Sequence, residues 1–337
     1  MKLGIERLLE EPALRKPLLG RRVALLAHPA SVTRELTHSL DALAALAALR
    51  LRAAFGPQHG LRGDKQYNMV ETADFVDPLH RIPVFSLYGS VRRPTAAMMD
   101  TFDVLLVDLQ DLGCRIYTFI TTLRLDLEYQ VIPMQGWQPD AAPGFGWPLY
   151  ERTWVNPSPN APNLWMARCY AGTVMLEGTT LSEGRGTTRP LEVLGAPDLE
   201  VEALVKEMRA LAPGWLEGCL LRPCWFEPTF NKHTGMLCTG LQLHVEDAAH
   251  YDHSAFRPWR LVALAFKALR RLRPDYPLWA DFPYEYEFNR RPIDVINGSD
   301  LLRTWVDDPH SSPADLDALA ALDEAEWRAQ RQSVLLY

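Results

Sequence analysis

The stretch Arg22-Val23-Ala24-Leu25-Leu26-Ala27 is a short, nearly continuous apolar run that ends at His28-Pro29-Ala30-Ser31. Runs of this kind are typical of strands that are buried on both faces of a parallel sheet. Helical apolar spacing follows between residues 37 and 49, and three further strands are predicted at 51–55, 82–87 and 104–107. Each predicted strand runs into a polar loop. Strands that alternate with helices in this way predict an open parallel α/β sheet, whose ligands gather at the carboxyl ends of the strands.

The chain has 337 residues, of which 47% are hydrophobic and 23% charged. This is the composition of a globular protein, and the length suggests two domains. Proline, glycine and tryptophan dominate from residue 130 to 162, so we place the boundary there, with one domain over 1–130 and a second over 131–337. The second half is predicted to be α+β, with helices near 201–211, 259–272 and 313–331 and strands near 220–226 and 240–245.

The net charge of −7 offers no electrostatic case for binding nucleic acid or an anionic membrane. The longest apolar stretches, such as residues 40–49, are too short to cross a bilayer. The N-terminus enters a charged amphipathic pattern without a signal-peptide core, so a cytoplasmic location is expected. The sequence provides no basis for predicting an oligomeric state.

Neither a metal nor a cofactor is predicted. The five cysteines form no C-x-x-C pair, and the nine histidines form no H-E-x-x-H motif. Cys219 and Cys224 are instead interpreted as small buried hydrophobes. No G-x-G-x-x-G follows the first predicted strand, which argues against a dinucleotide.

Residues 176–190, Leu-Glu-Gly-Thr-Thr-Leu-Ser-Glu-Gly-Arg-Gly-Thr-Thr-Arg-Pro, are the most polar motif in the chain. The segment has no apolar periodicity, so it is predicted to be a loop rather than a core strand or an amphipathic helix. Its glycines would let the backbone approach a ligand, and its arginines suit an anionic group. The alternative interpretation is a solvated surface loop.

Four other segments carry groups able to bind or react. Residues 56–64 and 108–117 follow predicted strands, residues 156–160 form a proline-rich turn with amide side chains, and residues 229–235 combine a cation, an imidazole and an aromatic ring. Acids, amides, arginines and aromatic rings together suit sugar binding. A structural alternative exists for each segment: Asp108 could cap a helix and pair with Arg115, while Tyr117 and Phe230 could belong to the core.

Taken in order, segments 55–63, 83–89, 108–117, 157–160, 176–190 and 229–235 resemble the bacterial exo-β-N-acetylmuramidase family, long known as a domain of unknown function. The resemblance extends from residue 4 to 337, and the core Glu-Gly-Thr-x-Leu-Ser-Glu-Gly-Arg-Gly-Thr-Thr-x-Pro is highly specific. It implies a Rossmann-like N-terminal domain, a smaller α+β domain and a site in the cleft between them. It also implies release of terminal N-acetylmuramic acid from the non-reducing end of peptidoglycan fragments.

Glycoside hydrolysis usually needs a proton donor and a second carboxylate, or participation by the acetamide of the sugar. The predicted catalytic residues are Gln58, which would position the substrate, His59 or Asp111, which would transfer the proton, and Glu183, which would stabilise the oxocarbenium-like charge. The lactyl carboxylate of the muramyl ligand could pair with Arg62, Arg185 or Lys232. The predicted substrate-binding residues are Arg62, Gln110, Arg115, Tyr117, Asn160, Glu177, Ser182, Arg185, Thr187, Lys232 and His233.

This chain departs from the family pattern in two places. The family loop usually reads Pro-Glu-His-Gly, with the glutamate as the acid/base, whereas this chain has Gln58, whose amide carries no titratable proton. The family also continues past Tyr117 with a strand that ends in Asp-Arg-Pro-Asn-Pro, which is absent here, so the first domain is predicted to be shortened. Two alternatives therefore remain open, namely a non-catalytic muropeptide-binding relative and a hydrolase for another acidic sugar.

Overall fold

The computed structural model describes residues 1–63, 65, 70–114, 116–117, 128–138, 147–148, 150–246 and 250–336. The chain divides into two compact units, one of which comprises the described residues up to Asn163 and the other those from Leu164 on. The change therefore falls later than residue 130. Two contacts tie the segment after residue 130 to the N-terminus: Lys2 pairs with Gln135, and Arg7 donates to the Pro133 carbonyl at 2.8 Å. The second unit comprises more of the chain than the first.

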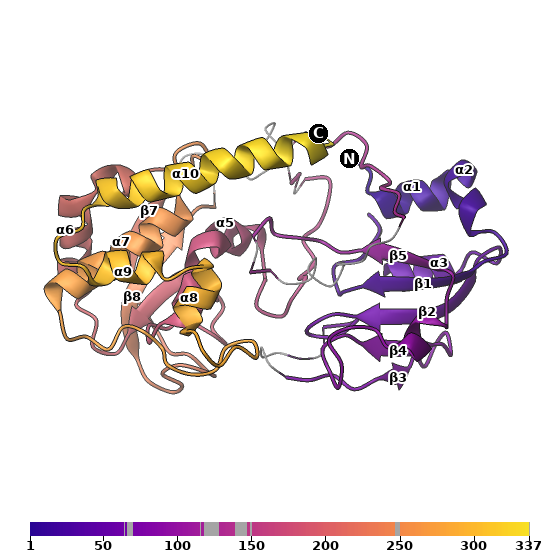
Figure 1. Cartoon of the computed structure of the whole chain (residues 1–337), viewed down its shortest axis with the longest axis horizontal. Helices are drawn as coiled ribbons and strands as arrows, with labels where there is room; N and C mark the ends of the chain where they lie inside the picture. The colour runs from indigo at the N-terminus through magenta and orange to yellow at the C-terminus, as the bar shows by residue number, and fades with distance from the viewer. Residues whose placement is uncertain are drawn as a thin grey trace. The chain divides into compact units, whose positions relative to one another are not determined.

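The first unit is built on a five-stranded sheet in the order β3-β4-β2-β1-β5 (Figure 1). Strands β1 (Arg22–Ala27), β2 (Arg50–Gly56), β4 (Pro83–Ser86) and β5 (Val104–Asp108) are parallel, and the two-residue β3 (Phe75–Val76) runs antiparallel to β4. All four predicted strands are present. The predicted α/β class is therefore confirmed.

Successive side chains of a strand point to opposite faces of the sheet, and each face of this sheet packs against its own apolar core. Val23, Leu25 and Ala27 of β1 enter one core with residues of α1 (Gly4–Glu10) and α3 (Ser39–Ala44). Ala24 and Leu26 enter the other core, with Met98 of α4 (Ala96–Met99). Two further short helical elements are α2 (Pro12–Arg15) and η1 (Lys16–Leu18).

Helix α3 is shorter than the predicted span of 37–49. The chain leaves the helix at Ala45 and makes a turn in which the Leu49 amide donates to the Leu46 carbonyl at 2.8 Å. The turn buries Leu49 and directs Arg50 into β2. The apolar residues after 45 thus serve the turn rather than a continued helix.

The strand order reverses between β1 and β5. Strands β2 and β4 extend the sheet on one side of β1, and the chain then crosses to place β5 on the other side. In open α/β sheets, ligands bind beyond the carboxyl ends of the strands at such a switch point. The turn after β1 and the end of β5 are therefore the positions at which this sheet is expected to meet a ligand.

The second unit contains an antiparallel sheet in the order β6-β8-β7, formed by β6 (Val193–Ala196), β8 (Cys238–His244) and β7 (Leu220–Phe226). The predicted helices and strands of this half are present, and β6 is an addition. The helical elements are α5 (Leu164–Thr173), η3 (Val174–Gly178), α6 (Val201–Leu211), η4 (Pro213–Leu216), α7 (Pro258–Leu272), α8 (Pro292–Asn297), α9 (Leu301–Asp307), α10 (Pro313–Arg331) and η5 (Gln332–Val334). None of the helices in the described ranges could span a membrane.

Helix α7 lies in the core of this unit and carries a completely buried lysine, Lys267. Its ammonium donates to the carbonyls of Trp305 at 2.9 Å and Asp308 at 2.5 Å, and to Ser311 Oγ at 2.7 Å. These acceptors lie at the C-terminal end of α9, where unpaired carbonyls favour a cation. Lys267 of α7 therefore caps the C-terminal end of α9.

Gly172 of α5 is in contact with the first turn of α7. A Cβ added at Gly172 would lie 2.0 Å from the Pro258 carbonyl oxygen. Gly172→Ala is expected to destabilise the protein by about 1–3 kcal/mol, because overpacking against backbone outweighs the roughly 1 kcal/mol gain in helix propensity. The measurement is the denaturant midpoint, with Gly214→Ala as the control, since nothing lies within 4 Å of that added Cβ. An unchanged midpoint for Gly172→Ala would contradict the predicted clash.

Candidate active site

The polar segment 176–190 is largely buried rather than solvated. Ser182, Glu183 and Arg185 are 1%, 0% and 5% exposed. Ser182 exchanges two backbone hydrogen bonds with Gly195 of β6, at 2.8 and 3.0 Å, so the segment is attached to the sheet. A segment with this composition can be buried only if its polar groups satisfy one another.

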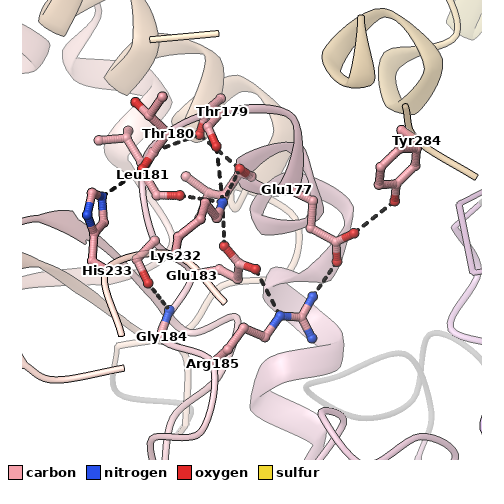
Figure 2. Close-up of polar contacts among 12 residues, drawn as sticks. Glu177, Thr179, Thr180, Leu181, Glu183, Gly184, Arg185, Lys232, His233 and Tyr284 are labelled. Atoms are coloured by element: carbon pink, nitrogen blue, oxygen red, sulfur yellow. Dashed lines mark hydrogen bonds and ion pairs between the residues drawn. The ribbon is translucent and has the colours of Figure 1, made fainter. Parts of the chain in front are cut away.

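Two glutamates and two cations form one continuous network (Figure 2). Glu183 Oε1 accepts from Arg185 Nε at 2.9 Å, and Glu183 Oε2 pairs with Lys232 Nζ at 2.7 Å. The Arg185 guanidinium also donates to Glu177 Oε1, and the hydroxyl of Tyr284 donates to Glu177 Oε2 at 2.8 Å. The network therefore carries two negative and two positive charges that balance.

Lys232 also organises the backbone of the segment. Its ammonium donates to the carbonyls of Leu176 at 2.6 Å, Thr179 at 3.2 Å and Leu181 at 2.5 Å. The neighbouring His233 ring contacts the Thr180 carbonyl through Nε2 at 2.8 Å. Segment 229–235 thus holds the turn at 176–183 in one conformation.

The charges of the network determine its protonation. Burial alone would raise the pKa of Glu183, but Lys232 and Arg185 outweigh burial and lower it to about 2. Burial alone would lower the pKa of Arg185, and Glu177 and Glu183 raise it instead. Burial and the neighbouring Glu177 raise the pKa of Tyr284. Glu183 and Arg185 are therefore charged, and Tyr284 remains a neutral donor at neutral pH.

The three cations predicted to bind a substrate carboxylate already pair with protein carboxylates. Arg185 and Lys232 pair with the buried glutamates described above. In the first unit, Arg62 donates to both oxygens of Asp41, at 2.9 and 3.1 Å, and lies 3.7 Å from Asp77. The Arg62 side chain is 40% exposed, against 6% for Arg185 and 16% for Lys232. Arg62 is thus the most accessible of the three to an added anion.

Gln58 and His59 occupy the centre of a tight turn after β2. The turn is closed by a hydrogen bond from the Gly60 amide to the Pro57 carbonyl at 3.0 Å, and His59 has a left-handed φ of 69°. Such strain in a non-glycine residue is often stored at functional sites. His59 Nδ1 lies 2.7 Å from the Lys65 carbonyl, which can only accept, so Nδ1 carries the hydrogen and Nε2 is the basic nitrogen.

The segment after β5 is held by the turn after β1. The buried ring of His28 lies with Nε2 at 2.8 Å from the Gln110 amide nitrogen. Asp111 accepts from the Gly113 amide at 2.6 Å, and partial desolvation raises its pKa. Tyr117 is buried, which raises the pKa of its hydroxyl. Arg115, which was also predicted to bind substrate, lies outside the described residues.

The predicted residues thus fall into two groups, one in each unit. The first contains those beyond the carboxyl ends of the strands together with the buried Asn160, namely Gln58, His59, Arg62, Gln110, Asp111, Tyr117 and Asn160. The second is the network and its surroundings, where Ser182 Oγ accepts from the Gly184 amide at 3.1 Å and Thr187 Oγ1 donates to the Gly184 carbonyl at 2.7 Å. It contains Glu177, Ser182, Glu183, Arg185, Thr187, Lys232 and His233.

Sequence reasoning missed four participants. Asp41 and Asp77 pair with Arg62 from other segments of the first unit. Tyr284 lies 107 residues after Glu177, which it contacts. No local sequence pattern identifies these three residues. The position of His28, directly after a buried parallel strand, could have identified it as a candidate site residue. The described ranges bring together no group of three or more His, Cys, Asp or Glu side chains able to hold a metal ion.

Two family models match this chain, in the order of its two units. The model described as exo-β-N-acetylmuramidase NamZ, N-terminal, matches residues 23–129, and the C-terminal model matches residues 168–337, which include the buried network. The chain belongs to the NamZ exo-β-N-acetylmuramidase family. The resemblance inferred from the sequence is confirmed.

One NamZ relative and two structural neighbours align with most of the chain. The peptidoglycan β-N-acetylmuramidase NamZ of Bacillus subtilis strain 168 is 30% identical over 368 positions, covering 91% of this chain and 84% of the relative. Since 368 exceeds the 337 residues here, the relative has residues that this chain lacks. Two crystal structures of DUF1343 family proteins from Bacteroides fragilis NCTC 9343 are 23% and 21% identical, with TM-scores of 0.76 and 0.67. Each alignment covers 100% of this chain and 98% of the crystal-structure chain, so both neighbours have the same fold as this chain.

Proposed function

We propose that this chain is an exo-acting glycoside hydrolase that releases terminal N-acetylmuramic acid from the non-reducing end of peptidoglycan fragments. The observation that carries the proposal is the match of both family models, in order, with the buried 176–190 segment inside the second. The 30% identical relative, named a peptidoglycan β-N-acetylmuramidase, supports the same substrate class.

Within the first unit, His59 is the proposed proton-transfer residue. The Lys65 carbonyl orients its ring, and Nε2 is the basic nitrogen. Gln58 in the same turn would position the sugar through its amide, which can donate and accept but has no acidic proton. Gln110, Asp111, Tyr117 and Asn160 are the further candidates for contact with the sugar.

Arg62 is the residue we assign to the lactyl carboxylate, the group that distinguishes muramic acid from glucosamine. Its side chain is 40% exposed, and its guanidinium has five donors, two of which are used by Asp41. An exposed guanidinium with further donors can add a carboxylate without losing its protein partner.

In the second unit, the complete burial of Glu183 favours a positioning role over direct contact with an oxocarbenium-like sugar. Glu183 holds Arg185 and Lys232, and Lys232 holds three carbonyls of the 176–181 turn. The groups that contact the sugar would then be the backbone and the hydroxyls of segment 176–190, and the buried ion network would hold that segment in place. Glu177 and Arg185 are likewise assigned to support.

The test compares three substrates: 4-nitrophenyl β-N-acetylmuramide, the matching N-acetylglucosaminide and the muramyl–glucosamine disaccharide. We expect kcat/KM to favour the muramide over the glucosaminide by about 10–100-fold, the value of a charged hydrogen bond to the lactyl carboxylate. Equal turnover of the two aryl glycosides would contradict muramyl specificity. Absence of turnover with calorimetric binding of N-acetylmuramic acid would instead indicate a non-catalytic binding relative.

A further inference from the structure

Asp108 occupies the switch point of the sheet. It is the last residue of β5 and pairs in register with Ala27, the last residue of β1. On the other side of β1 lies β2, which leads into the turn with Gln58 and His59. Adjacent strands are about 4.8 Å apart, so Asp108 and the start of that turn lie about 10 Å apart across one strand. Both lie at the carboxyl edge of the sheet, where sheets of this kind bind ligands.

The chain after β1 holds Asp108 in a defined orientation. Ser39 Oγ donates to Asp108 Oδ2 at 2.5 Å, and Ser31 Oγ donates to the Asp108 carbonyl at 2.5 Å. With a hydroxyl donor on Oδ2, the oxygen that carries the exchangeable proton is Oδ1. Asp108 is half-buried and ends β5 at the carboxyl edge of the sheet, where such sheets bind ligands.

Burial, more than the neighbouring charges, raises the pKa of the Asp108 carboxyl. Glu6 on α1 repels its negative charge, while Arg152 attracts it but is itself paired with Glu6 at 2.9 Å. His28 is neutral, because burial lowers its pKa to about 4, and burial also lowers the pKa of His38. Burial raises the pKa of Asp108 to about 6, although the Ser39 hydrogen bond lowers it. Carboxyls in this range are effective general acids near neutral pH.

We propose that Asp108 protonates the leaving-group oxygen and so supplies the acid that Gln58 cannot. The inference rests on the proposed glycosidase function. As the bond between C1 and the glycosidic oxygen breaks, its electron pair stays with the oxygen, which takes the Asp108 proton and departs as an alcohol. Water forms the new bond to C1 and loses a proton to His59 Nε2. That proton returns to Asp108 through solvent, so the overall reaction is hydrolysis.

The test uses leaving groups that differ in their need for a proton. With Asp108→Asn, we expect kcat/KM for the muramyl–glucosamine disaccharide to fall by about 10²–10⁴-fold, the usual contribution of a general acid. Nitrophenolate leaves without protonation, so turnover of 4-nitrophenyl β-N-acetylmuramide should fall less than about tenfold. Asp323→Asn, on the exposed face of α10, is the matched control, and Asp111→Asn tests the neighbouring acid.

The pH profile adds a readout that a structural role would not move. In the unaltered chain, disaccharide turnover should decline as pH rises through about 6, because Asp108 loses its proton, and this limb should disappear in Asp108→Asn. Ser39→Ala keeps the carboxyl and removes the hydrogen bond that lowers its pKa, so the limb should shift to higher pH. Ser39→Ala therefore tests the proposal even if Asp108→Asn folds poorly.

The outcomes separate the inference from the function it rests on. Equal losses on both substrates, or no loss on either, would overturn the role of Asp108 and leave the glycosidase intact. An unaltered chain that turns over neither substrate would overturn both proposals. Selective loss of disaccharide turnover, with a shifted limb in Ser39→Ala, is the result we expect.

Discussion

Glu183→Gln is expected to lower the free energy of unfolding by about 3–5 kcal/mol, because it removes one partner from a buried ion network. The amide has the same shape but no charge, so Arg185 would keep its pair with Glu177 while Lys232 would lose its pair with residue 183. Loss of the Lys232 anchor would also free the carbonyls of the 176–181 turn. We expect muramyl-substrate turnover to fall with the loss of this ordered segment.

Thermal unfolding measures this effect. A loss of that size corresponds to a decrease in Tm of roughly 6–20 °C for a unit of this length. The control is Glu202→Gln on the exposed side of α6, which should leave Tm within about 1–2 °C, as surface substitutions usually do. A Glu183→Gln chain as stable as the control would show that the network contributes no net stability.

The same variant should change the dependence of stability on acid. The folded-state pKa of Glu183 is about 2 and its ordinary value is 4.5, so its contribution is fully present above pH 4.5 and is lost as pH falls toward 2. Unfolding of the unaltered chain should therefore become easier over this window. The Glu183→Gln chain lacks this contribution and should show a flatter acid dependence.

Gln58→Glu is expected to restore disaccharide hydrolysis to the Asp108→Asn chain by about 10²-fold or more, since a general acid typically contributes 10²–10⁴-fold. Glutamate and glutamine have the same length, so the turn closed by Pro57 and Gly60 can hold either side chain. The substitution would place a carboxyl where the family motif carries one. In the chain that retains Asp108, the gain should be smaller, because an acid is already present.

Gln58→Met serves as the control for this rescue, because it fills the same volume without an acid or an amide. Recovery with glutamate and none with methionine would establish that a proton donor is the missing function. No recovery with glutamate would show that a carboxyl at residue 58 cannot reach the leaving group. Turnover that appears only with Gln58→Glu, with a silent unaltered chain, would favour the binding-protein interpretation.

Much of the fold could be predicted from the sequence. The run 22–27 reads as a buried strand because both of its faces need apolar cover, and it forms β1 with the predicted bounds. Helices α6 and α10 also have the predicted ranges, since apolar periodicity and a proline after a serine act locally. Helix α3 differed because the turn after Ala45, which local periodicity does not encode, ends it early.

The candidate site was only partly predictable. The residues beyond the strands were identifiable because parallel strands bring their carboxyl ends to one edge of the sheet. The motif at 176–190 was recognised by its composition, but its environment was not. Its charges indicated either an exposed ligand loop or a solvated one, and the structure buries them among one another.

The sequence by itself determined the class of the two folds, the order of their elements and the family, because these depend on local periodicity and motif order. Only the tertiary structure determined which charged and polar side chains contact one another. Lys232 and Tyr284 reach the glutamates from segments roughly 50 and 100 residues away, and Ser39 of α3 reaches Asp108 from 69 residues earlier in the chain. Whether a carboxyl is an ion that holds a loop or an acid that can donate a proton depends on its burial and on the charges beside it. Both are set by distant parts of the chain.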